Sequence, residues 1–279
     1  MKRVETLTDL ELALPIDGQI GFIPTMGALH DGHLSLVAKA KKEKMFAVAS
    51  IFVNPTQFND PKDFQKYPRD TEADIAKLNS AGCDLVFLPH EDEIYNEGLT
   101  ADKYLHDFGF LESRLEGAFR PDHFKGVAQI VHILLEAVAP DYAFFGEKDF
   151  QQLQVIRALV KKASLNVEVI GMPTIREPDG LAMSSRNRRL SDDARAESPA
   201  LYQCLSHAKT HLSNKGIEAI KTEVKNMIEA TDTLRLEYFD MVDPDTFESV
   251  TDSHPKHNVR ALIAAYAGDV RLIDNLKLA

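Results

Sequence analysis

Residues 19–33 read QIGFIPTMGALHDGH, and this stretch sets the fold expected for the first part of the chain. Residues 19–23 form an apolar run that predicts a short buried strand, stopped by Pro24. From Gly32 to Lys44 the apolar spacing becomes helical, and the segment ends in lysines, which suit a helix C-terminus. The chain is therefore expected to pass from a strand, through a loop with two glycines, into a helix.

The same alternation continues to about residue 172. Further strands are expected at 46–52, 84–88, 141–145 and 166–172, and helices at 71–80, 127–138 and 149–162. Strands separated by helices predict a parallel sheet, and right-handed crossovers then give a doubly wound, Rossmann-like α/β domain. In such sheets ligands bind at the carboxyl ends of the strands.

The pattern changes after about Pro173. Helices are expected at 194–212 and 217–230, followed by strands at 234–242, 258–265 and 269–273. This order predicts a smaller α+β domain with an antiparallel sheet. We place the boundary between Pro173 and Ser191 and expect two domains, residues 1–174 and 175–279, of which the second is a lid.

Composition limits the classes of partner and compartment. The chain has 279 residues, 44% hydrophobic and 27% charged, as in globular proteins. The net charge of −11 argues against nucleic acid as a partner. The sequence contains no membrane-length apolar run and no signal-peptide pattern. Two separated cysteines, Cys83 and Cys204, favour a reduced, cytoplasmic setting.

The loop from Pro24 to His33 carries two histidines three residues apart. A helix N-terminus has unpaired N–H groups and a partial positive charge, which favour phosphate. Gly27 and Gly32 are expected to let the backbone turn tightly and approach a ligand. His30 and His33 would face one side and donate to phosphate oxygens. A satisfied surface pair, or half of a metal site, remains an alternative for the histidines taken alone.

Two further segments have phosphate-binding chemistry. Residues 182–187, AMSSRN, combine two hydroxyls with a guanidinium, which suits a flexible anion clamp. A helix cap before Leu190 is the alternative. In residues 144–152, FFGEKDFQQ, Lys148 and Gln152 lie four apart and off the apolar helix face, so they would face a ligand together. A solvated lysine is the alternative there.

Amides follow the second predicted strand. Asn54 and Gln57 lie in the apolar segment FVNPTQF, residues 52–58. Buried amides need hydrogen-bond partners, and a polar organic substrate is one candidate. The alternative is a turn that Asn54 stabilises next to Pro55.

Taken together, these blocks resemble the pantothenate synthetase family, the ligases that join pantoate to β-alanine. The first loop is similar to the HIGH motif of the nucleotidyltransferase superfamily. The resemblance extends to residues 120–127, RPDHFKGV, and 259–266, VRALIAAY, and so covers nearly the whole chain. One local difference is Asp122, where the family often has glycine.

The resemblance implies a reaction in two steps, with magnesium accompanying ATP. Pantoate attacks the α-phosphate of ATP to give pantoyl adenylate and pyrophosphate, and the β-alanine amine then displaces AMP. The catalytic residues would be His33, His30, Lys148 and Arg186. The ATP contacts would be Pro24, Met26, Gly27, Ala28, Leu29, His30, Asp31, Gly32, His33, Gly146, Glu147, Lys148, Asp149, Ile175, Met183, Ser184, Ser185 and Arg186.

The resemblance also assigns the organic substrates. Gln57 and Gln152 would hold pantoate, Gln57 would also lie at the β-alanine position, and Asn54 and Arg120 would belong to the same pocket. The family is usually a homodimer through its N-terminal domain. The alternatives are another adenylyl- or cytidylyltransferase of the superfamily, which would lack the amide-rich pocket, and a non-catalytic nucleotide-binding regulator. An aminoacyl-tRNA synthetase is disfavoured by the acidic chain.

Overall fold

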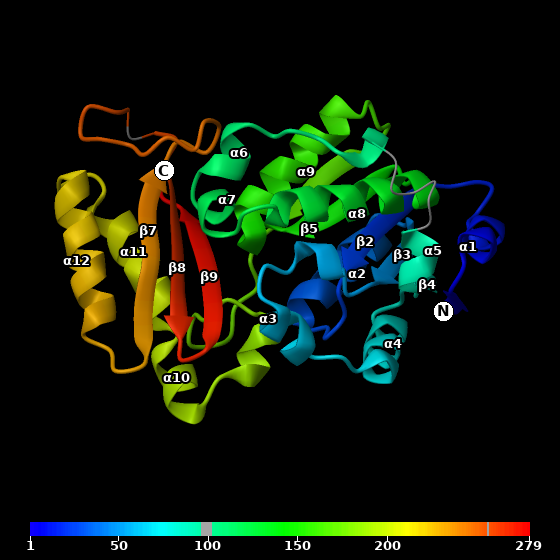
Figure 1. Ribbon diagram of the computed structural model, residues 1–279, viewed down its shortest axis with the longest axis horizontal. Coiled ribbons are helices and arrows are strands. Elements are labelled where there is room, and N and C mark those ends of the chain that lie inside the picture. Colours follow the sequence, from blue (N-terminus) through cyan, green and yellow to red (C-terminus); the bar gives the residue numbers. More distant parts are fainter. Residues whose placement is uncertain (96–101, 256) are drawn as a thin grey trace. The chain divides into compact units, whose positions relative to one another are not determined.

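The computed structural model describes residues 1–95, 102–255 and 257–279 (Figure 1). The chain divides into two compact units, Met1–Pro173 and Thr174–Ala279. The first unit is built on a parallel sheet and the second on an antiparallel sheet.

The parallel sheet is the scaffold of the first unit. Among the described residues it has six strands in the order β1-β4-β3-β2-β5-β6, and neighbouring strands run parallel. The predicted doubly wound α/β fold is thereby confirmed. The edge strand β1 was not predicted, because three residues show no periodicity. The strands are β1 Lys2–Val4, β2 Ile20–Thr25, β3 Phe46–Ile51, β4 Leu85–Phe87, β5 Tyr142–Gly146 and β6 Glu168–Met172.

Helices connect these strands. The longest of them match the predicted helices in position, whereas the short ones were not predicted, because a single turn leaves little periodic signal. The helices of the first unit are α1 Leu7–Ala13, α2 Asp31–Lys42, η1 Pro55–Gln57, α3 Pro61–Lys66, α4 Thr71–Ser80, α5 Glu91–Ile94, η2 Asp102–Tyr104, α6 Phe110–Ser113, α7 Glu116–Phe119, α8 His123–Val138, η3 Glu147–Asp149 and α9 Phe150–Lys162.

Strand order reverses at β2. The chain moves from β2 to β3 and β4 on one side, then returns through α8 to β5 on the other side of β2. With right-handed crossovers, α2 and α8 therefore cover opposite faces of the sheet. The α2 face packs tightly, since a Cβ on Gly21 of β2 would lie 2.9 Å from Cβ of Ala40. Ligands of doubly wound sheets bind where the strand order reverses, which is here beyond the ends of β2 and β5.

Pro24 does not stop β2, which continues to Thr25. The carbonyl of Thr25 accepts from the N–H of Phe52, so Thr25 faces β3. Backbone groups alternate along a strand, so Pro24 faces β5, whose pairing with β2 reaches only Phe22. The missing N–H of Pro24 therefore leaves no ladder bond unmade.

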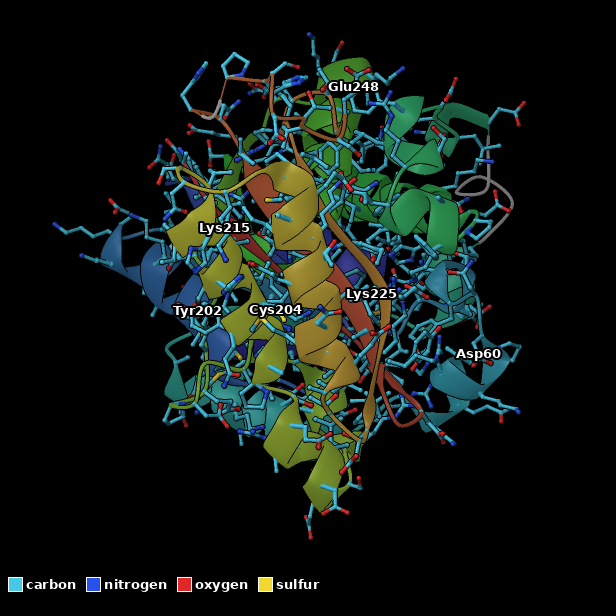
Figure 2. All side chains as sticks on the ribbon, turned by 90° about the vertical axis from the view of Figure 1, so that its left-hand side faces the viewer. Asp60, Tyr202, Cys204, Lys215, Lys225 and Glu248 are labelled. Carbon is cyan, nitrogen blue, oxygen red and sulfur yellow. The ribbon has the colours of Figure 1, made fainter. Side chains whose placement is uncertain are left out.

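The second unit holds an antiparallel sheet in the order β7-β8-β9. Helices α11 and α12 contact each other and the sheet, and Figure 2 shows Tyr202 and Cys204 on α11. The predicted helix over 194–212 is wrong in one respect, because Pro199 divides it in two. The elements are η4 Ser185–Arg189, α10 Asp192–Glu197, α11 Ala200–His211, α12 Ile217–Glu229, β7 Leu234–Val242, β8 Arg260–Ala267 and β9 Val270–Lys277.

No helix within the described ranges has both the length and the apolarity needed to cross a bilayer. Both cysteines are free and buried. Burial raises the pKa of the Cys83 thiol to about 11 and that of Cys204 to about 12, so neither is a reactive thiolate at neutral pH.

Candidate active site

Predicted site residues of the first unit gather where β2, β3 and β5 end. The Gln57 amide, after β3, donates to the sulfur of Met26, after β2. The ammonium of Lys148, after β5, lies close enough to His33 to lower its pKa. Loops from three neighbouring strands therefore meet at the reversal of strand order.

The loop after β2 takes an unusual backbone path. Gly27 and Ala28 have φ of 76° and 50°, both in the left-handed region. A non-glycine residue there costs about 1 kcal/mol or more and persists only where neighbours enforce it. Glycine is required at the first position, where a Cβ would come within 3.0 Å of Asp74 Oδ2. The predicted turn at Gly27 is confirmed, whereas Gly32 has ordinary helical backbone inside α2.

The backbone N–H groups of this loop face protein acceptors. That of Gly27 donates to Thr25 Oγ1, those of Ala28 and Leu29 to Asp74, that of His30 to His33, and that of Gly32 to His30. The expectation that unpaired N–H groups at this helix start would meet a phosphate is therefore wrong for these five residues. The side chains of this loop are therefore the stronger candidates as donors for an anion.

The two histidines cap α2 reciprocally. His30 Nδ1 accepts from the N–H of Gly32 at 3.2 Å, and His33 Nδ1 accepts from the N–H of His30 at 3.3 Å. A ring nitrogen that accepts carries no proton, so each neutral ring holds its hydrogen on Nε2. The ring centroids are 4.1 Å apart. The pair therefore presents two neutral N–H donors side by side.

The pKa of His33 is well below its usual value of 6.5. Withdrawal of the ring from water is the largest cause, followed by the positive charge of His30 when protonated and the nearby ammonium groups of Lys148 and Lys77. His33 is thus neutral at neutral pH, in the tautomer that its hydrogen bond selects.

A buried carboxylate on α4 holds this loop, and sequence reasoning missed it. Asp74 is 1% exposed, and its oxygens accept from the N–H of Ala28 at 2.6 Å and of Leu29 at 2.8 Å. Three residues further along α4, Lys77 Nζ donates to the carbonyl of Leu29 at 2.7 Å. A charged residue in line with buried Leu78 on an amphipathic helix was the available signal.

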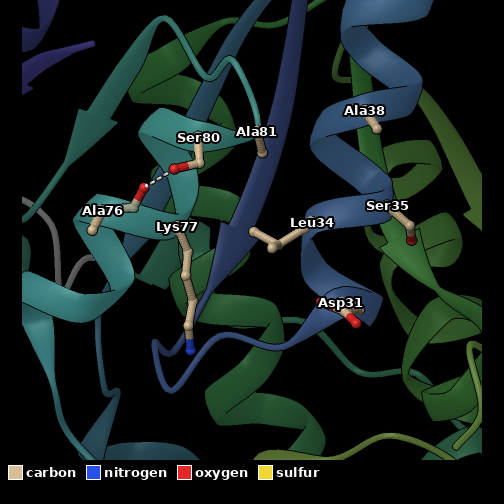
Figure 3. A pocket seen from close by; sticks show the side chains of 8 residues that line it. All are labelled: Asp31, Leu34, Ser35, Ala38, Ala76, Lys77, Ser80 and Ala81. Atoms are coloured by element: carbon tan, nitrogen blue, oxygen red, sulfur yellow. Dashed lines mark hydrogen bonds between the residues drawn. The ribbon is translucent and has the colours of Figure 1, made fainter.

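Between α2 and α4 lies a groove of about 570 Å³ (Figure 3). Leu34 and Ser80 contribute to its walls, and Lys77 reaches from α4 toward the loop that precedes α2. Ala28 and Leu29 are fully buried. Their side chains therefore shape the loop from within.

Asn54 and Gln57 are both buried but differ in their partners. Asn54 Oδ1 accepts from Tyr95 at 2.7 Å and from the N–H of Thr56, which caps η1. Its Nδ2 donates to the carbonyl of Gly126 at 3.1 Å. This supports the alternative in which Asn54 stabilises a turn. The Gln57 amide has weaker partners, because its donor group, Nε2, faces a thioether and its oxygen accepts a 3.4 Å bond from Asn54, so Nε2 could donate to a better acceptor.

The start of α8 fixes the backbone of Gln57. His123 Nδ1 donates to the Gln57 carbonyl at 2.8 Å, and Arg120 donates to His123 Nε2 at 2.9 Å. Arg120 thus lies beside Gln57. A Cβ on Gly126 would lie 2.5 Å from the Thr56 carbonyl oxygen, so only glycine allows this approach. Asp122, the local departure from the family, has φ 62°, a conformation that glycine adopts more easily.

Adjacent glutamines on α9 have different environments. Gln151 is 1% exposed and holds the α6–α7 turn, donating to the carbonyls of Leu111 and Arg114 at 2.8 Å each. Gln152 is partly exposed, like Lys148, whose Nζ lies 3.7 Å from Asp149. The predicted pair of Lys148 and Gln152 is therefore accessible, while the neighbouring Gln151 is structural.

The remaining predicted residues lie in the second unit. Ile175 and Met183 face each other across a hairpin, in which the Met183 N–H donates to the Ile175 carbonyl at 3.0 Å. Ser184 caps η4, since its Oγ accepts from the Arg186 N–H at 3.3 Å. The cap interpretation therefore applies to Ser184, which caps η4 directly before Leu190.

Comparison with known proteins identifies the family. A family model described as pantoate-beta-alanine ligase matches residues 1–277. The pantothenate synthetase of Christiangramia forsetii is 46% identical over 264 residues, which cover 94% of this chain and 93% of the relative.

Solved structures agree. The crystal structure of pantothenate synthetase from Thermus thermophilus has a TM-score of 0.93 at 42% identity and covers 100% of this chain and 99% of its own. Pantoate-beta-alanine ligase from Francisella tularensis, complexed with beta-gamma ATP and beta-alanine, has a TM-score of 0.82 at 35% identity, with coverage of 100% and 98%. The chain therefore belongs to the pantoate–β-alanine ligase family.

Proposed function

We propose that this protein condenses pantoate with β-alanine at the expense of ATP, through a pantoyl adenylate. The observation that carries the proposal is the meeting of neutral imidazole donors, a lysine and the Gln57 amide where the strand order reverses, in a member of this family. The imidazoles and the lysine suit a triphosphate, and the amides suit a small hydroxy acid.

In the first step a pantoate carboxylate oxygen attacks the α-phosphorus of ATP. The bond to the β-phosphate oxygen breaks, and pyrophosphate leaves with the electron pair. Positioning and charge stabilisation supply most of the catalysis in such transfers. His30 and His33 donate Nε2–H to oxygens that gain charge, and Lys148 offsets that charge. Gln57 and Gln152 orient pantoate through its hydroxyls and carboxylate.

In the second step the β-alanine amine attacks the acyl carbon of the adenylate. The carbon–oxygen bond to the phosphate breaks, AMP leaves, and the new amide nitrogen releases its proton to solvent. Gln57 lies beside the position proposed for this amine. Asn54 and Arg120 contribute by holding Gln57, since both contact it.

From the second unit we assign Ile175 to the adenine side of ATP and residues 183–186 to the phosphates, with the unit acting as a lid. The support is the chemistry of the segment, which joins two hydroxyls and Arg186 on one short turn. A lid would shield the reactive adenylate from water.

We propose that Mg²⁺ accompanies ATP. Across the described parts of the chain no group of three His, Cys, Asp or Glu residues is arranged to hold a metal. This fits an ion whose ligands are mostly phosphate oxygens and water, as Mg²⁺ prefers. When bound, the ion would neutralise part of the charge of the triphosphate.

We also propose a cytoplasmic homodimer formed through the first unit. The family resemblance supports the dimer, and the two free cysteines fit a reducing compartment. Sedimentation equilibrium that gave only the mass of one chain would contradict the dimer.

The test of function separates the two steps. Exchange of labelled pyrophosphate into ATP should require pantoate but not β-alanine, and AMP with pantothenate should accumulate only when all three substrates are present. Exchange that proceeds without pantoate would contradict the proposal. A screen of other acids and nucleotides would then distinguish another adenylyl- or cytidylyltransferase, and ATP binding without any turnover would indicate a regulator.

A further inference from the structure

We propose that Arg176 and Asp274 form a positioning pair that presets the nucleotide-binding segment of the second unit. The inference rests on the proposed function, in which Ile175 and residues 183–186 contact ATP. It assigns a role to two residues that touch neither substrate in that scheme.

The segment is a narrow hairpin. The Glu177 N–H donates to the Leu181 carbonyl at 2.8 Å, the Met183 N–H donates to the Ile175 carbonyl at 3.0 Å, and Arg176 pairs with Ala182 as an isolated antiparallel bridge. Ile175 and Met183 lie at its base. The proposed adenine and phosphate contacts therefore lie at the base of one hairpin. An isolated two-stranded hairpin is only marginally stable in water.

Arg176 fastens this hairpin to the sheet. Its Nη1 donates to Asp274 Oδ2 at 2.6 Å and its Nη2 to Oδ1 at 3.0 Å, a two-pronged contact with β9. Nη1 also donates to the Gly180 carbonyl at 3.0 Å, in the hairpin turn. One guanidinium therefore joins the tip of the hairpin to the sheet.

Helix α11 supports the same guanidinium from another side. The central carbon of the Arg176 guanidinium lies 4.0 Å from the ring centroid of Tyr202, a residue of α11. Gly180, at φ 96°, fits closely against this ring, because a Cβ there would lie 2.5 Å from Tyr202 Cδ1. These contacts with Tyr202 restrict the position of the hairpin tip.

The pair is better suited to fixing geometry than to adding stability. Asp274 has a side chain only 2% exposed, and a buried ion pair gains little free energy once its desolvation is counted. A planar fork on a carboxylate does, however, set both distance and orientation. The apolar core of this unit, around Leu205, Ile220 and Ile263, includes Leu181 of the hairpin and so supplies its packing energy. We therefore expect the pair to set the position of the hairpin rather than the stability of the unit.

The first test replaces Arg176 with Lys, which keeps the charge but loses the fork. In wild-type protein, pantoate-dependent pyrophosphate exchange must be present, and its absence would count against the proposed function rather than the pair. In Arg176→Lys we expect the KM for ATP to rise about tenfold while the KM for pantoate stays within about twofold. Amide hydrogen exchange at Met183 should become faster.

Arg271→Lys is the matched control. Arg271 donates to Glu237 through Nε at 2.8 Å and Nη2 at 2.5 Å, and both side chains are slightly more buried than that of Arg176. This pair joins β9 to β7. We expect a comparable loss of Tm, an unchanged KM for ATP and unchanged exchange at Met183.

An Arg176→Lys variant that behaves like the control would overturn the proposal, as would an equal rise in KM for both substrates. If Arg176→Lys does not fold, Tyr202→Leu removes the ring support alone. We then expect the KM for ATP to rise about threefold with faster exchange at Met183. Unchanged values in that variant would equally overturn the proposal.

Discussion

The two segments proposed to bind ATP are held in place by different means. The loop after β2 is held by Asp74, whose carboxylate accepts two backbone N–H groups. The hairpin of the second unit is held by Asp274, whose carboxylate accepts a guanidinium. The first segment offers neutral imidazole donors to a ligand, and the second offers Arg186, which is always charged.

This difference predicts different roles for the two segments in the proposed reaction. Neutral Nε2–H donors are directional, so His30 and His33 are suited to one defined oxygen position in the transition state. A permanent cation on a short turn attracts a triphosphate over a wider range of positions. We therefore expect changes in the first segment to affect mainly kcat for adenylation, and changes in the second to affect mainly the KM for ATP.

The largest effect is expected from His33→Ala. Loss of the Nε2–H donor should lower the rate of pantoate-dependent exchange by about 10²–10⁴-fold, the usual range for a positioned donor in the transition state. The substitution also removes part of the α2 cap, at a cost of about 0.5–2 kcal/mol. Rapid-quench measurement of adenylate formation gives the rate directly.

Thr6→Ala controls for the lost cap. Thr6 Oγ1 accepts from the Asp9 N–H at 3.1 Å and caps α1, outside the proposed site. It should lower Tm by a similar amount and leave the rate near normal. Near-normal adenylation by folded His33→Ala protein would contradict the role assigned to this ring.

Asp74→Asn tests the support of the first segment. An amide keeps one acceptor oxygen but turns an N–H donor toward the other loop N–H, which costs about 1–3 kcal/mol. We expect adenylation to slow by about 10–30-fold as the histidines lose their position. Removing a negative charge near the proposed triphosphate site would by itself favour ATP binding. A loss of rate would therefore identify the displaced histidines as the cause.

Asp84→Asn is the comparison variant. Asp84 Oδ2 accepts from the Ala47 N–H at 2.7 Å and from Lys41 at 2.6 Å. Asp84 lies just before β4, at the amino-terminal ends of the parallel strands, whereas the proposed site lies at their carboxyl ends. Asp84 also accepts a backbone N–H, although its side chain is 30% exposed and its second partner is a lysine, and its site is remote. Equal rates in the two variants, at similar Tm, would show that the loop does not depend on Asp74.

These contacts also show what the sequence could and could not reveal. The order of strands and helices was predictable, because apolar periodicity is local and β2 to β6 each span several residues. The Rossmann-like fold and the loop after β2 followed from it. The position of Asp74 in line with Leu78 indicated that it is buried, but its partners were not predictable, because they lie 46 and 45 residues away.

The orientation of neighbouring side chains could not be predicted from the sequence either. Gln151 and Gln152 have the same chemistry, and only the packing of α9 against α6 and α7 buries the first and exposes the second. The free N–H groups expected at α2 are absent among the five loop residues described above, because Thr25 and Asp74 accept from three of them and the two histidines from the other two. The spacing of the histidines permits their reciprocal cap but does not require it.

The pH dependence of adenylation distinguishes the two segments further. Because the pKa of His33 lies well below 6.5, its ring remains neutral as pH falls through 6.5, and activity that needs the neutral ring is lost only near the lowered pKa. The unfolded chain does bind a proton at this residue near pH 6.5, so acid also reduces stability below that pH. At pH 5.5 we expect the wild type to exceed, by up to about tenfold, the rate that an ordinary histidine would give.

The measurement is a pH–rate profile with an NMR titration of the ring. The neighbours named above, His30, Lys148 and Lys77, contribute to the shift. In Lys148→Met the pKa of His33 should therefore move up toward its usual value. An acid limb at pH 6.5 that follows the titration of His33 would contradict this account.

The smallest effect is expected from Ser184→Ala, which tests the second segment. The Ser184 hydroxyl caps η4 through a long 3.3 Å bond, and its loss should cost about 0.5–1 kcal/mol, which raises the KM for ATP only about two- to fivefold if the hydroxyl acts as a cap alone. Ser191→Ala is the matched variant, because Ser191 caps α10 by accepting from the Ala194 N–H at the same distance of 3.3 Å. A KM increase above tenfold in Ser184→Ala alone would mean that the hydroxyl contacts a phosphate directly, so that the second segment, like the first, also uses neutral directional donors.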